Sequence, residues 1–319
     1  MPPRIGISIG DPNGIGVETA LKAVSELGDG RSEIGGVLIG DRNLIQGEAD
    51  TLGMKCPEVL DPGVAFPVPH YGETSAEAGR ASAAWVDAGI QACLTRELDA
   101  LVTAPINKHA WDLAGIGFPG HTEMLGDRCG TDRFGMMLMG KGLRVFIATR
   151  HLPLSKVAET LKESDVRLAI ELVSKGLPWM GVPQPKIAVC GLNPHAGDGG
   201  TLGTEERDWI EPLIQELRED VPGVSGPHPA DTVFHQAVHG SYDAVIAMYH
   251  DQGLGPLKLL AFDEGVNVTL GLPIIRTSPD HGTAFGIAGK GLARPDSMLH
   301  AIQAAVDLTQ RPNPWMPQR

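Results

Sequence analysis

The sequence predicts an α/β fold with a mostly parallel, mixed sheet. Hydrophobic runs of strand length alternate with amphipathic stretches of helix length, which is typical of strand–helix–strand units. Three runs, at residues 146–148, 187–190 and 244–248, are continuously apolar, as expected of parallel strands buried on both faces. With 319 residues, the chain is long enough for a large core and for one or two domains.

The expected elements follow in chain order. The pattern Thr74–Ser75–Ala76–Glu77 predicts the start of a long alanine-rich helix, and the runs that flank Gly140–Lys141–Gly142 predict a hairpin. The full set comprises strands at 5–9, 37–39, 101–103, 136–139 and 143–148, helices at 17–26, 74–96, 155–162, 164–175 and 204–218, a strand–helix–strand unit over 243–270, and a closing helix at 296–310.

Composition excludes several classes of function. The 26 Lys and Arg against 39 Asp and Glu give a formal net charge of −13, and an acidic surface repels nucleic acids and anionic membranes. We therefore expect no nucleic-acid and no membrane partner. The four cysteines are widely spaced, without a C-x-x-C pair, and no stretch is long enough to span a bilayer or to form a signal core. These features predict a cytoplasmic protein.

Each of the three apolar runs is followed by a histidine, namely His151, His195 and His250. Because ligands bind at the carboxyl ends of strands in α/β sheets, three imidazoles there predict a divalent-metal site with a position open for substrate. The Gly-rich segment 193–200, which contains His195, predicts a tight turn. Asp251 is suited to fix the tautomer of the adjacent His250. Taken singly, each histidine would more commonly be a surface or hydrogen-bonded core residue.

Two further segments have the residues of an anion site. Residues 10–16 have the spacing G-x-x-x-G-x-G and open a helix, although that spacing alone favours a structural turn and is neither a dinucleotide fingerprint nor a P-loop. After Gly120, Thr122 can cap a helix while His121 faces a ligand; a plain capping box is the alternative.

Two cations lie in apolar stretches, Lys258 and Arg276. A charge in such surroundings is costly unless it is paired, and a phosphate or carboxylate ligand would pair both. Internal salt bridges to Asp231, Asp251 or Asp263 are the alternative. Residues 280–284 then lead into a Gly-rich stretch at 287–291, which we expect to be helical and whose start could hold a nucleotide.

In combination these motifs resemble the 4-hydroxythreonine-4-phosphate dehydrogenase family of pyridoxal phosphate biosynthesis. The resemblance covers nearly the whole chain. It rests on the segments 10–16 (GDPNGIG), 103–108 (TAPINK), 120–123 (GHTE), 192–197 (LNPHAG), 248–253 (MYHDQG) and 275–284 (IRTSPDHGTA). The last three segments are highly specific together. One departure is Val17 before Glu18, where the family often has proline.

The resemblance implies an isocitrate/isopropylmalate-dehydrogenase-like α/β/α fold with two subdomains around a cleft. We expect a cofactor-side subdomain at 1–120 and 280–319 and a metal, substrate and dimerisation subdomain at 121–279. The resemblance also implies a homodimer with a shared active site. His151 and His195 of one subunit and His250 of the other would hold a divalent metal (Zn, Mg, Co or Mn).

The resemblance further implies contacts to a small phosphorylated substrate and to NAD or NADP. Substrate contacts map to His121, Thr122, Lys258, Asn267 and Arg276, and cofactor contacts map to His281, Gly282 and Thr283. Asp231, Asp251 or a metal-bound water could be the general base.

The implied reaction is the metal-dependent oxidation of 4-phosphohydroxy-threonine to a 3-oxo acid, which decarboxylates to 3-amino-2-oxopropyl phosphate. One alternative is a paralogous dehydrogenase of phosphorylated threonate or erythronate, or of a dihydrodiol dicarboxylate. More distant alternatives are a three-histidine zinc hydrolase and a non-catalytic metal-dependent binding protein, neither of which would change nicotinamide absorbance.

Overall fold

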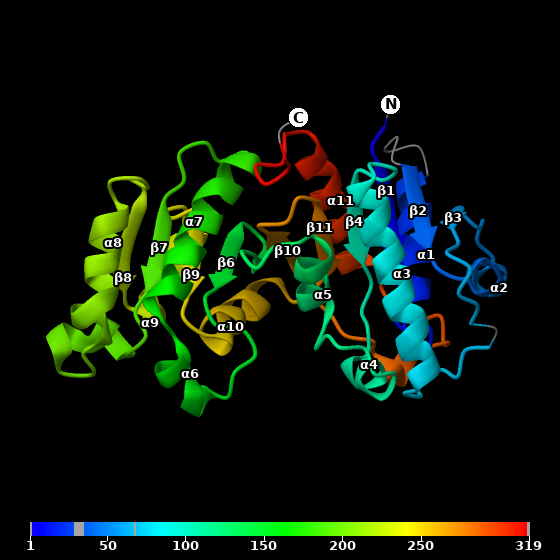
Figure 1. Cartoon of the computed structure of the whole chain (residues 1–319), viewed down its shortest axis with the longest axis horizontal. Coiled ribbons are helices and arrows are strands. Elements are labelled where there is room, and N and C mark those ends of the chain that lie inside the picture. Colours follow the sequence, from blue (N-terminus) through cyan, green and yellow to red (C-terminus); the bar gives the residue numbers. More distant parts are fainter. Residues whose placement is uncertain (1, 29–34, 67, 318–319) are drawn as a thin grey trace. The chain divides into compact units, whose positions relative to one another are not determined.

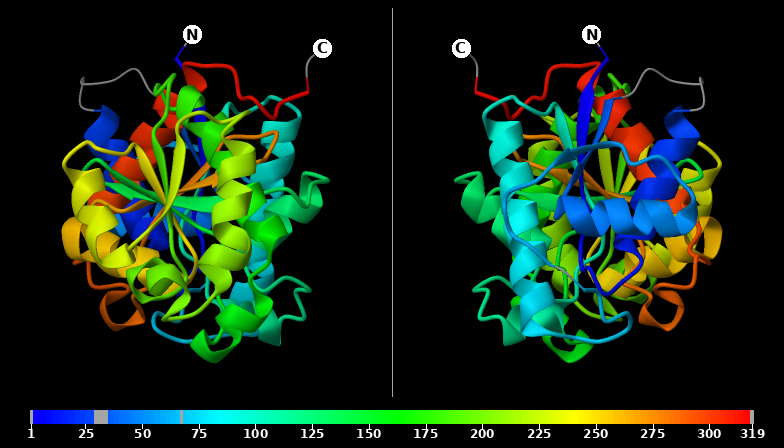
Figure 2. Two further views of the ribbon diagram at one scale, coloured as in Figure 1. Left: turned by 90° about the vertical axis from the view of Figure 1, so that its left-hand side faces the viewer. Right: turned by 90° about the vertical axis from the view of Figure 1, so that its right-hand side faces the viewer.

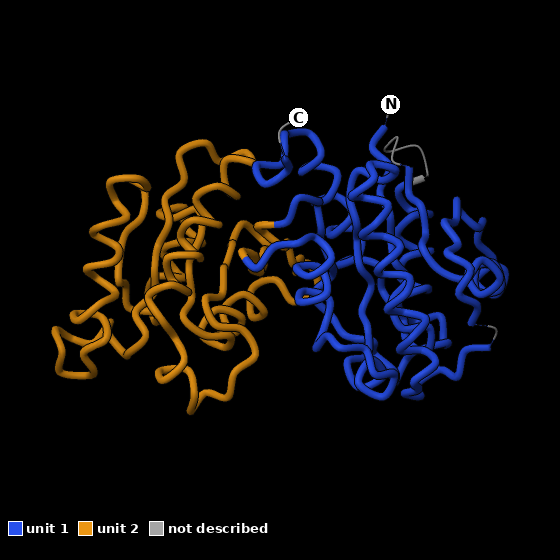
Figure 3. The backbone as a smooth tube through the Cα atoms, viewed as in Figure 1, with its two compact units in different colours: residues 1–132, 272–319 blue, residues 133–271 orange. Residues whose placement is uncertain are grey.

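The structure is a computed structural model that describes residues 2–28, 35–66 and 68–317. It divides into two compact units (Figure 3): residues 1–132 with 272–319 form unit 1, and residues 133–271 form unit 2. The sequence-based division set its boundaries at 120 and 280 instead. As a consequence His121, Thr122 and Arg276 belong to unit 1.

Unit 1 contains a parallel sheet with the strand order β3-β2-β1-β4-β11. Its strands are β1 (Arg4–Ser8), β2 (Gly35–Ile39), β3 (Glu58–Leu60), β4 (Ala100–Thr103) and β11 (Arg276–Pro279). Its helices are α1 (Gly16–Gly28), α2 (Arg42–Leu52), α3 (Ala76–Leu94), α4 (Lys108–Leu113), α5 (His121–Arg128), α11 (Asp296–Thr309) and the short η3 (Phe285–Ile287). Figures 1 and 2 show α3 on one face of this sheet and α1 and α11 on the other.

The central strands of unit 1 are buried on both faces. In β1, Ile5 and Ile7 point to one face and Gly6 and Ser8 to the other, and Ile5, Ile7 and Ser8 have no exposed surface. On one side of this strand the register pairs Ile5 with Ala100 of β4. Burial on both faces explains why the inward positions of β1 hold only apolar or small residues on either side of the sheet.

Unit 2 contains a mixed sheet with the strand order β10-β5-β6-β9-β7-β8. Its strands are β5 (Gly135–Gly140), β6 (Leu143–Ile147), β7 (Ile187–Cys190), β8 (Val224–His228), β9 (Ala244–Ala247) and β10 (Val266–Leu270). Its helices are α6 (Leu154–Thr160), α7 (Glu163–Trp179), η1 (Pro194–Gly200), η2 (Glu206–Ile210), α8 (Glu211–Leu217), α9 (Ala230–Val238) and α10 (His250–Ala261). Strand β5 runs antiparallel to both neighbours, whereas β6, β9, β7 and β8 are mutually parallel.

The two faces of the unit 2 sheet are covered by different helices. Helices α9 and α10 lie on one face (Figure 2), where Val233 and Leu257 join a buried cluster with strand residues such as Val145 and Val245. Helix α7 covers the opposite face. Mixed α/β architecture with a mostly parallel sheet is therefore confirmed, as is the predicted hairpin of β5 and β6.

Some local predictions were wrong. The helix predicted at 287–291 is wrong: the short η3 ends at Ile287, and Gly289 and Gly291 both adopt φ of 70°, in the left-handed region that a right-handed helix excludes. The helix predicted at 204–218 is confirmed in position, as a π-helical segment, η2, that runs directly into α8. Helix α2 was not predicted. Among the described residues, no helix combines the length and apolar composition that crossing a bilayer requires.

Candidate active site

Three neighbouring parallel strands of unit 2 each lead to one of the predicted histidines. The strands lie in the order β6, β9, β7, and their carboxyl ends continue to His151, His250 and His195 respectively. We call these three residues the histidine edge. Sequence analysis predicted this arrangement, since parallel strands end at the same edge of a sheet.

Two members of the histidine edge lie close together within one chain. The ring centroids of His151 and His250 are 5.4 Å apart. The Nδ1–H of His250 donates to the Asp251 carboxylate over 2.7 Å, which leaves Nε2 to bind a metal. Within the described ranges, however, no three His, Cys, Asp or Glu side chains are placed to hold a metal ion. The close pair in the described residues is thus His151 with His250, whereas the expected pair was His151 with His195.

His195 occupies a left-handed turn that a buried carboxylate holds in place. Residues 195–199 all have positive φ, from 43° to 78°. Glu206 is 4% exposed and accepts from the backbone N–H of Asn193 at 2.7 Å and from its side-chain amide at 2.9 Å. The strained turn that presents His195 is thus tied to the start of η2. Sequence analysis predicted the turn but missed Glu206, because nothing local marks a carboxylate thirteen residues away from its partner.

In unit 1 a buried arginine lies beside a histidine. Arg276 is 2% exposed and donates through Nη2 to the Thr103 hydroxyl at 2.7 Å. Burial lowers its pKa to about 10, against the opposing field of the Glu123 carboxylate. The guanidinium therefore stays charged at neutral pH. We call Lys108, His121 and Arg276 the cation cluster.

His121 is held neutral inside the cation cluster. Burial is the main cause that lowers its pKa well below the ordinary value, and the charges of Arg276 and Lys108 add to the effect. Its ring packs edge-on against Trp111, with centroids 5.7 Å apart. The helix α5 begins at His121 with Gly120 as its N-cap, so Thr122 lies in the first turn and is not the cap that the sequence predicted.

The remaining predicted substrate contacts lie in unit 2. Asn267 on β10 donates its amide to the sulfur of Met136 at 3.4 Å, and its Oδ1 is buried without a hydrogen-bond partner. Lys258 on α10 places its ammonium 5.7 Å from the centroid of the Phe262 ring. The positively charged end of Lys258 therefore lies beside an aromatic face on an exposed part of α10.

The predicted cofactor segment is fastened to the first glycine-rich loop. The carbonyl of Thr283 accepts from the backbone N–H of Ile15 at 3.1 Å. His281 shares a hydrogen bond of 3.0 Å between Nδ1 and the adjacent carbonyl of Gly282, while its Nε2 is buried and unpartnered. When Nδ1 carries the proton, Nε2 is an acceptor, which suits a ligand hydroxyl or amide donor.

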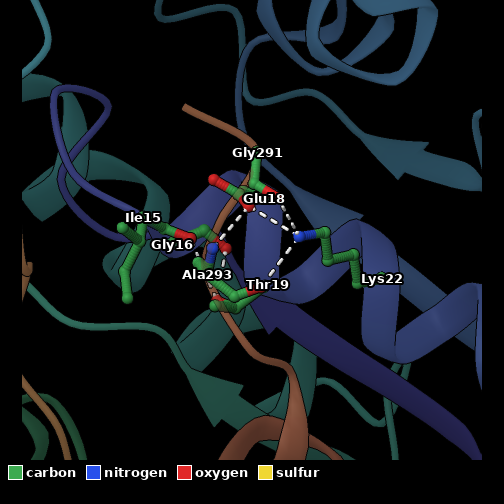
Figure 4. Close-up of polar contacts among 7 residues, drawn as sticks. All are labelled: Ile15, Gly16, Glu18, Thr19, Lys22, Gly291 and Ala293. Atoms are coloured by element: carbon green, nitrogen blue, oxygen red, sulfur yellow. Dashed lines mark hydrogen bonds and ion pairs between the residues drawn. The ribbon is translucent and has the colours of Figure 1, made fainter. Parts of the chain in front are cut away.

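A buried ion pair holds the end of the same segment (Figure 4). Glu18, 2% exposed, accepts from the Lys22 ammonium at 2.7 Å and from the backbone N–H of Ala293 at 2.8 Å. Lys22 in turn donates to the carbonyls of Gly291 and Ala293 at 2.9 and 2.8 Å. Helix α1 thus fixes the path of residues 291–293 without requiring them to be helical.

Unpartnered buried atoms coincide with several predicted contacts. Among the described residues, buried side-chain atoms without a hydrogen-bond partner occur in Ser8, Asp11, Glu18, His121, Arg150, Asn267 and His281. His121, Asn267 and His281 were predicted as ligand contacts. Because an unmet buried polar atom is costly, such atoms are candidates for ligand binding. Arg150 and Asp11 were missed by sequence analysis.

The carboxylates considered as general base lie in different surroundings. Asp251 is 90% exposed and already accepts from His250. Asp231 is exposed in the first turn of α9. Asp11, which follows β1, is fully buried, and burial raises its pKa to about 6 against the stabilising hydrogen bond from the Asn13 backbone.

Comparison with known proteins places this arrangement in a family. Residues 34–305 match the family described as "Pyridoxal phosphate biosynthetic protein PdxA". The chain is 46% identical to a 4-hydroxythreonine-4-phosphate dehydrogenase of Ruegeria, over 98% of this chain and 99% of that protein. It is 40% identical to a D-threonate 4-phosphate dehydrogenase of Cupriavidus necator, over 97% of this chain and 98% of that protein. The crystal structure of a Klebsiella pneumoniae 4-hydroxythreonine-4-phosphate dehydrogenase superimposes with a TM-score of 0.87 at 37% identity, over 98% of this chain and 99% of that one.

Proposed function

Because the chain belongs to the PdxA family of pyridoxal phosphate biosynthesis, we propose that it oxidises 4-phosphohydroxy-threonine with NAD or NADP and a divalent metal. The observation in this chain that carries the proposal is the cation cluster. A buried, charged Arg276 lies beside a neutral His121 whose Nε2 lacks a partner. That combination suits a small anionic substrate that also offers hydrogen-bond donors and acceptors.

The cation cluster would bind the phosphate of the substrate. Arg276 supplies a planar fork of donors, and its bonds to Thr103 fix the orientation of that fork. His121 and Thr122 at the start of α5 would contact the same end of the substrate. Asn267 and Lys258 of unit 2 would supply further polar contacts.

The histidine edge fits a divalent metal by the chemistry of its donors. Imidazole suits zinc and cobalt better than magnesium, which prefers oxygen ligands. His151 and His250 lie near one another, and Asp251 fixes the ring of His250. We propose that the protein is a homodimer and that His195 of a second subunit completes the site.

In the proposed reaction the secondary alcohol loses a hydride from carbon and a proton from oxygen. When bound, the nicotinamide accepts the hydride, and the metal lowers the pKa of the alcohol and stabilises the charge left by decarboxylation. Asp251 already accepts a hydrogen bond from His250, so we assign to Asp231 the role of general base, which accepts the proton of the alcohol. The resulting 3-oxo acid loses carbon dioxide and gives 3-amino-2-oxopropyl phosphate.

Residues 281–283 would bind the dinucleotide, with Nε2 of His281 accepting a hydrogen bond from it. The bonds of Glu18 and Lys22 to residues 291–293 would keep this segment in place (Figure 4). We place the reaction in the cytoplasm, since all four cysteines are unpaired thiols, as in a reducing compartment.

The test is the absorbance of reduced nicotinamide on mixing protein, metal, dinucleotide and 4-phosphohydroxy-threonine. The proposal predicts dinucleotide reduction together with release of carbon dioxide, and faster turnover of this substrate than of D-threonate 4-phosphate. Faster turnover of D-threonate 4-phosphate would assign the chain to the paralogous activity. Product formation without dinucleotide reduction would indicate a hydrolase.

A further inference from the structure

Arg150 is a partly buried cation that the assignments above do not use. It follows Thr149 at the end of β6 and immediately precedes His151 of the histidine edge. We infer that Arg150 is a further substrate-binding residue, which pairs with the carboxylate of the substrate. This inference rests on the proposed function for the identity of the substrate.

The backbone around Arg150 is held in place by β9. Thr149 donates to the carbonyl of Met248 twice, through its backbone N–H at 3.2 Å and through its hydroxyl at 2.6 Å. The carbonyl of Arg150 accepts from the N–H of Leu152 at 2.9 Å. Arg150 therefore lies in a turn after β6 that is hydrogen-bonded to the segment after the neighbouring strand β9. The ring pair of His151 and His250 lies next to it.

The guanidinium of Arg150 is oriented but not satisfied. Its central carbon lies 5.1 Å from the centroid of the Phe134 ring, which restrains the side chain. Its Nη1 is buried and has no hydrogen-bond partner within the described residues. Other arginines of unit 2 differ: Arg144 donates Nη1 to the carbonyl of Asp243, and Arg167 pairs with Glu216.

An unmet buried guanidinium nitrogen costs free energy in the unliganded protein, so its burial requires an explanation. A bound oxyanion supplies one, because guanidinium donors match a carboxylate in two parallel hydrogen bonds. The proposed substrate carries two anionic groups. Its phosphate and its carboxylate each need a cationic partner, and Arg150 is suited to the carboxylate.

Substrate truncation combined with mutation tests the assignment. The substrates are 4-phosphohydroxy-threonine and its decarboxylated analogue 3-amino-2-hydroxypropyl phosphate. We expect Arg150→Met to lower kcat/KM for the acid by about ten- to a hundredfold, as for loss of a charge-assisted hydrogen bond, and to leave the analogue nearly unchanged. Arg150→Lys should recover part of the loss, since it restores charge without the fork. Arg144→Met, which replaces a partly buried arginine of β6, should behave as wild type.

Equal losses on both substrates, or no loss on either, would overturn the inference. Equal losses would assign Arg150 to the phosphate or to the fold. If light scattering shows that Arg150→Met differs from wild type in the mass of its assembly in solution, the inference would also be overturned, because the residue would then belong to a subunit contact.

A second measurement does not depend on turnover. We expect ligand-free Arg150→Met to unfold at a Tm no lower than that of wild type, because the substitution removes an unmet buried donor. Malonate, used as a carboxylate probe, should raise the Tm of wild type and of Arg144→Met more than that of Arg150→Met. A lower Tm of Arg150→Met without ligand, or equal protection of the three proteins by malonate, would contradict the inference. Failure of the wild type to oxidise the proposed substrate would instead refute the proposed function, and the malonate result would still test Arg150.

Discussion

The histidine edge of unit 2 and the cation cluster of unit 1 differ in how far their side chains are buried and brought together in one chain. In the cation cluster Arg276 is 2% exposed and His121 keeps a buried, unpartnered Nε2, whereas Lys108 is exposed. The histidine edge is more open, with His250 38% exposed and only two of its three rings close together. The cluster is therefore preorganised within one chain, whereas the proposed metal site at the histidine edge would need His195 of a second subunit.

Loss of a histidine should have the largest effect, because it removes a ligand that nothing else in the chain replaces. His195→Ala should lower kcat by about a thousandfold or more, since metal-assisted charge stabilisation contributes several kcal/mol. Chelator should abolish turnover of wild type, and zinc, cobalt, manganese and magnesium should restore it to different degrees. Metal content measured by atomic absorption should fall with activity. Full turnover by chelated, metal-free protein would show that the histidine edge does not hold a metal needed for the reaction.

Loss of the arginine of the cation cluster should have a smaller effect. Charge-assisted bonds to a buried anion contribute roughly 1.5–3 kcal/mol each. Arg276→Ala should therefore lower kcat/KM by about tenfold to a few hundredfold. Unphosphorylated 4-hydroxythreonine should be a poor substrate for wild type, and the variant should discriminate less between the two compounds. Equal wild-type rates on both compounds would show that the cluster does not bind phosphate.

The hydrogen bond from His250 to Asp251 should matter less than the ligands themselves. Asp251→Asn weakens the restraint on the ring, and outer-shell substitutions typically cost about 10- to 100-fold in metal affinity or activity. Competition against a metallochromic chelator measures the metal affinity. An unchanged affinity would mean that His250 needs no support, because the carboxylate is 90% exposed and water replaces it.

Most of the architecture could be predicted from the sequence, but only some of the residues of the histidine edge and of the cation cluster could be. The apolar runs before His151, His195 and His250 predicted three parallel strands ending at one edge, because burial on both faces leaves a local signature. The wrong helix at 287–291 shows the limit, since Gly289 and Gly291 have positive φ and the path of residues 291–293 depends on bonds to Glu18 and Lys22, far away in sequence. A buried polar atom without a hydrogen-bond partner, such as Nη1 of Arg150, cannot be predicted from the sequence, because it depends on which groups surround it in three dimensions.

Asp11 belongs to neither group of residues, and its effect should be visible in stability rather than in turnover. Its pKa is raised from 3.8 to about 6, so the folded protein holds this proton more tightly than the unfolded chain does. The stabilisation is fully present below pH 3.8 and is lost as pH rises through about 6, at a cost of about 3 kcal/mol above that pH. Asp11→Asn should therefore gain stability relative to wild type as pH rises from 4 to 7.5. Urea unfolding at both pH values measures this, and a constant difference would mean that Asp11 does not titrate in this range.

The measurement that tests the central claim most directly is complementation between inactive variants. His195→Ala and His250→Ala are refolded together in equal amounts, and about half of the dimers should be mixed. If His195 and His250 of one site come from different subunits, one of the two sites in each mixed dimer is intact, and roughly a quarter of wild-type activity returns. His151→Ala refolded with His250→Ala should recover nothing, because these two rings lie together in one chain. Mixed dimers of His195→Ala and His250→Ala that form without recovered activity would contradict the shared site and place the three histidines in one chain or away from the metal.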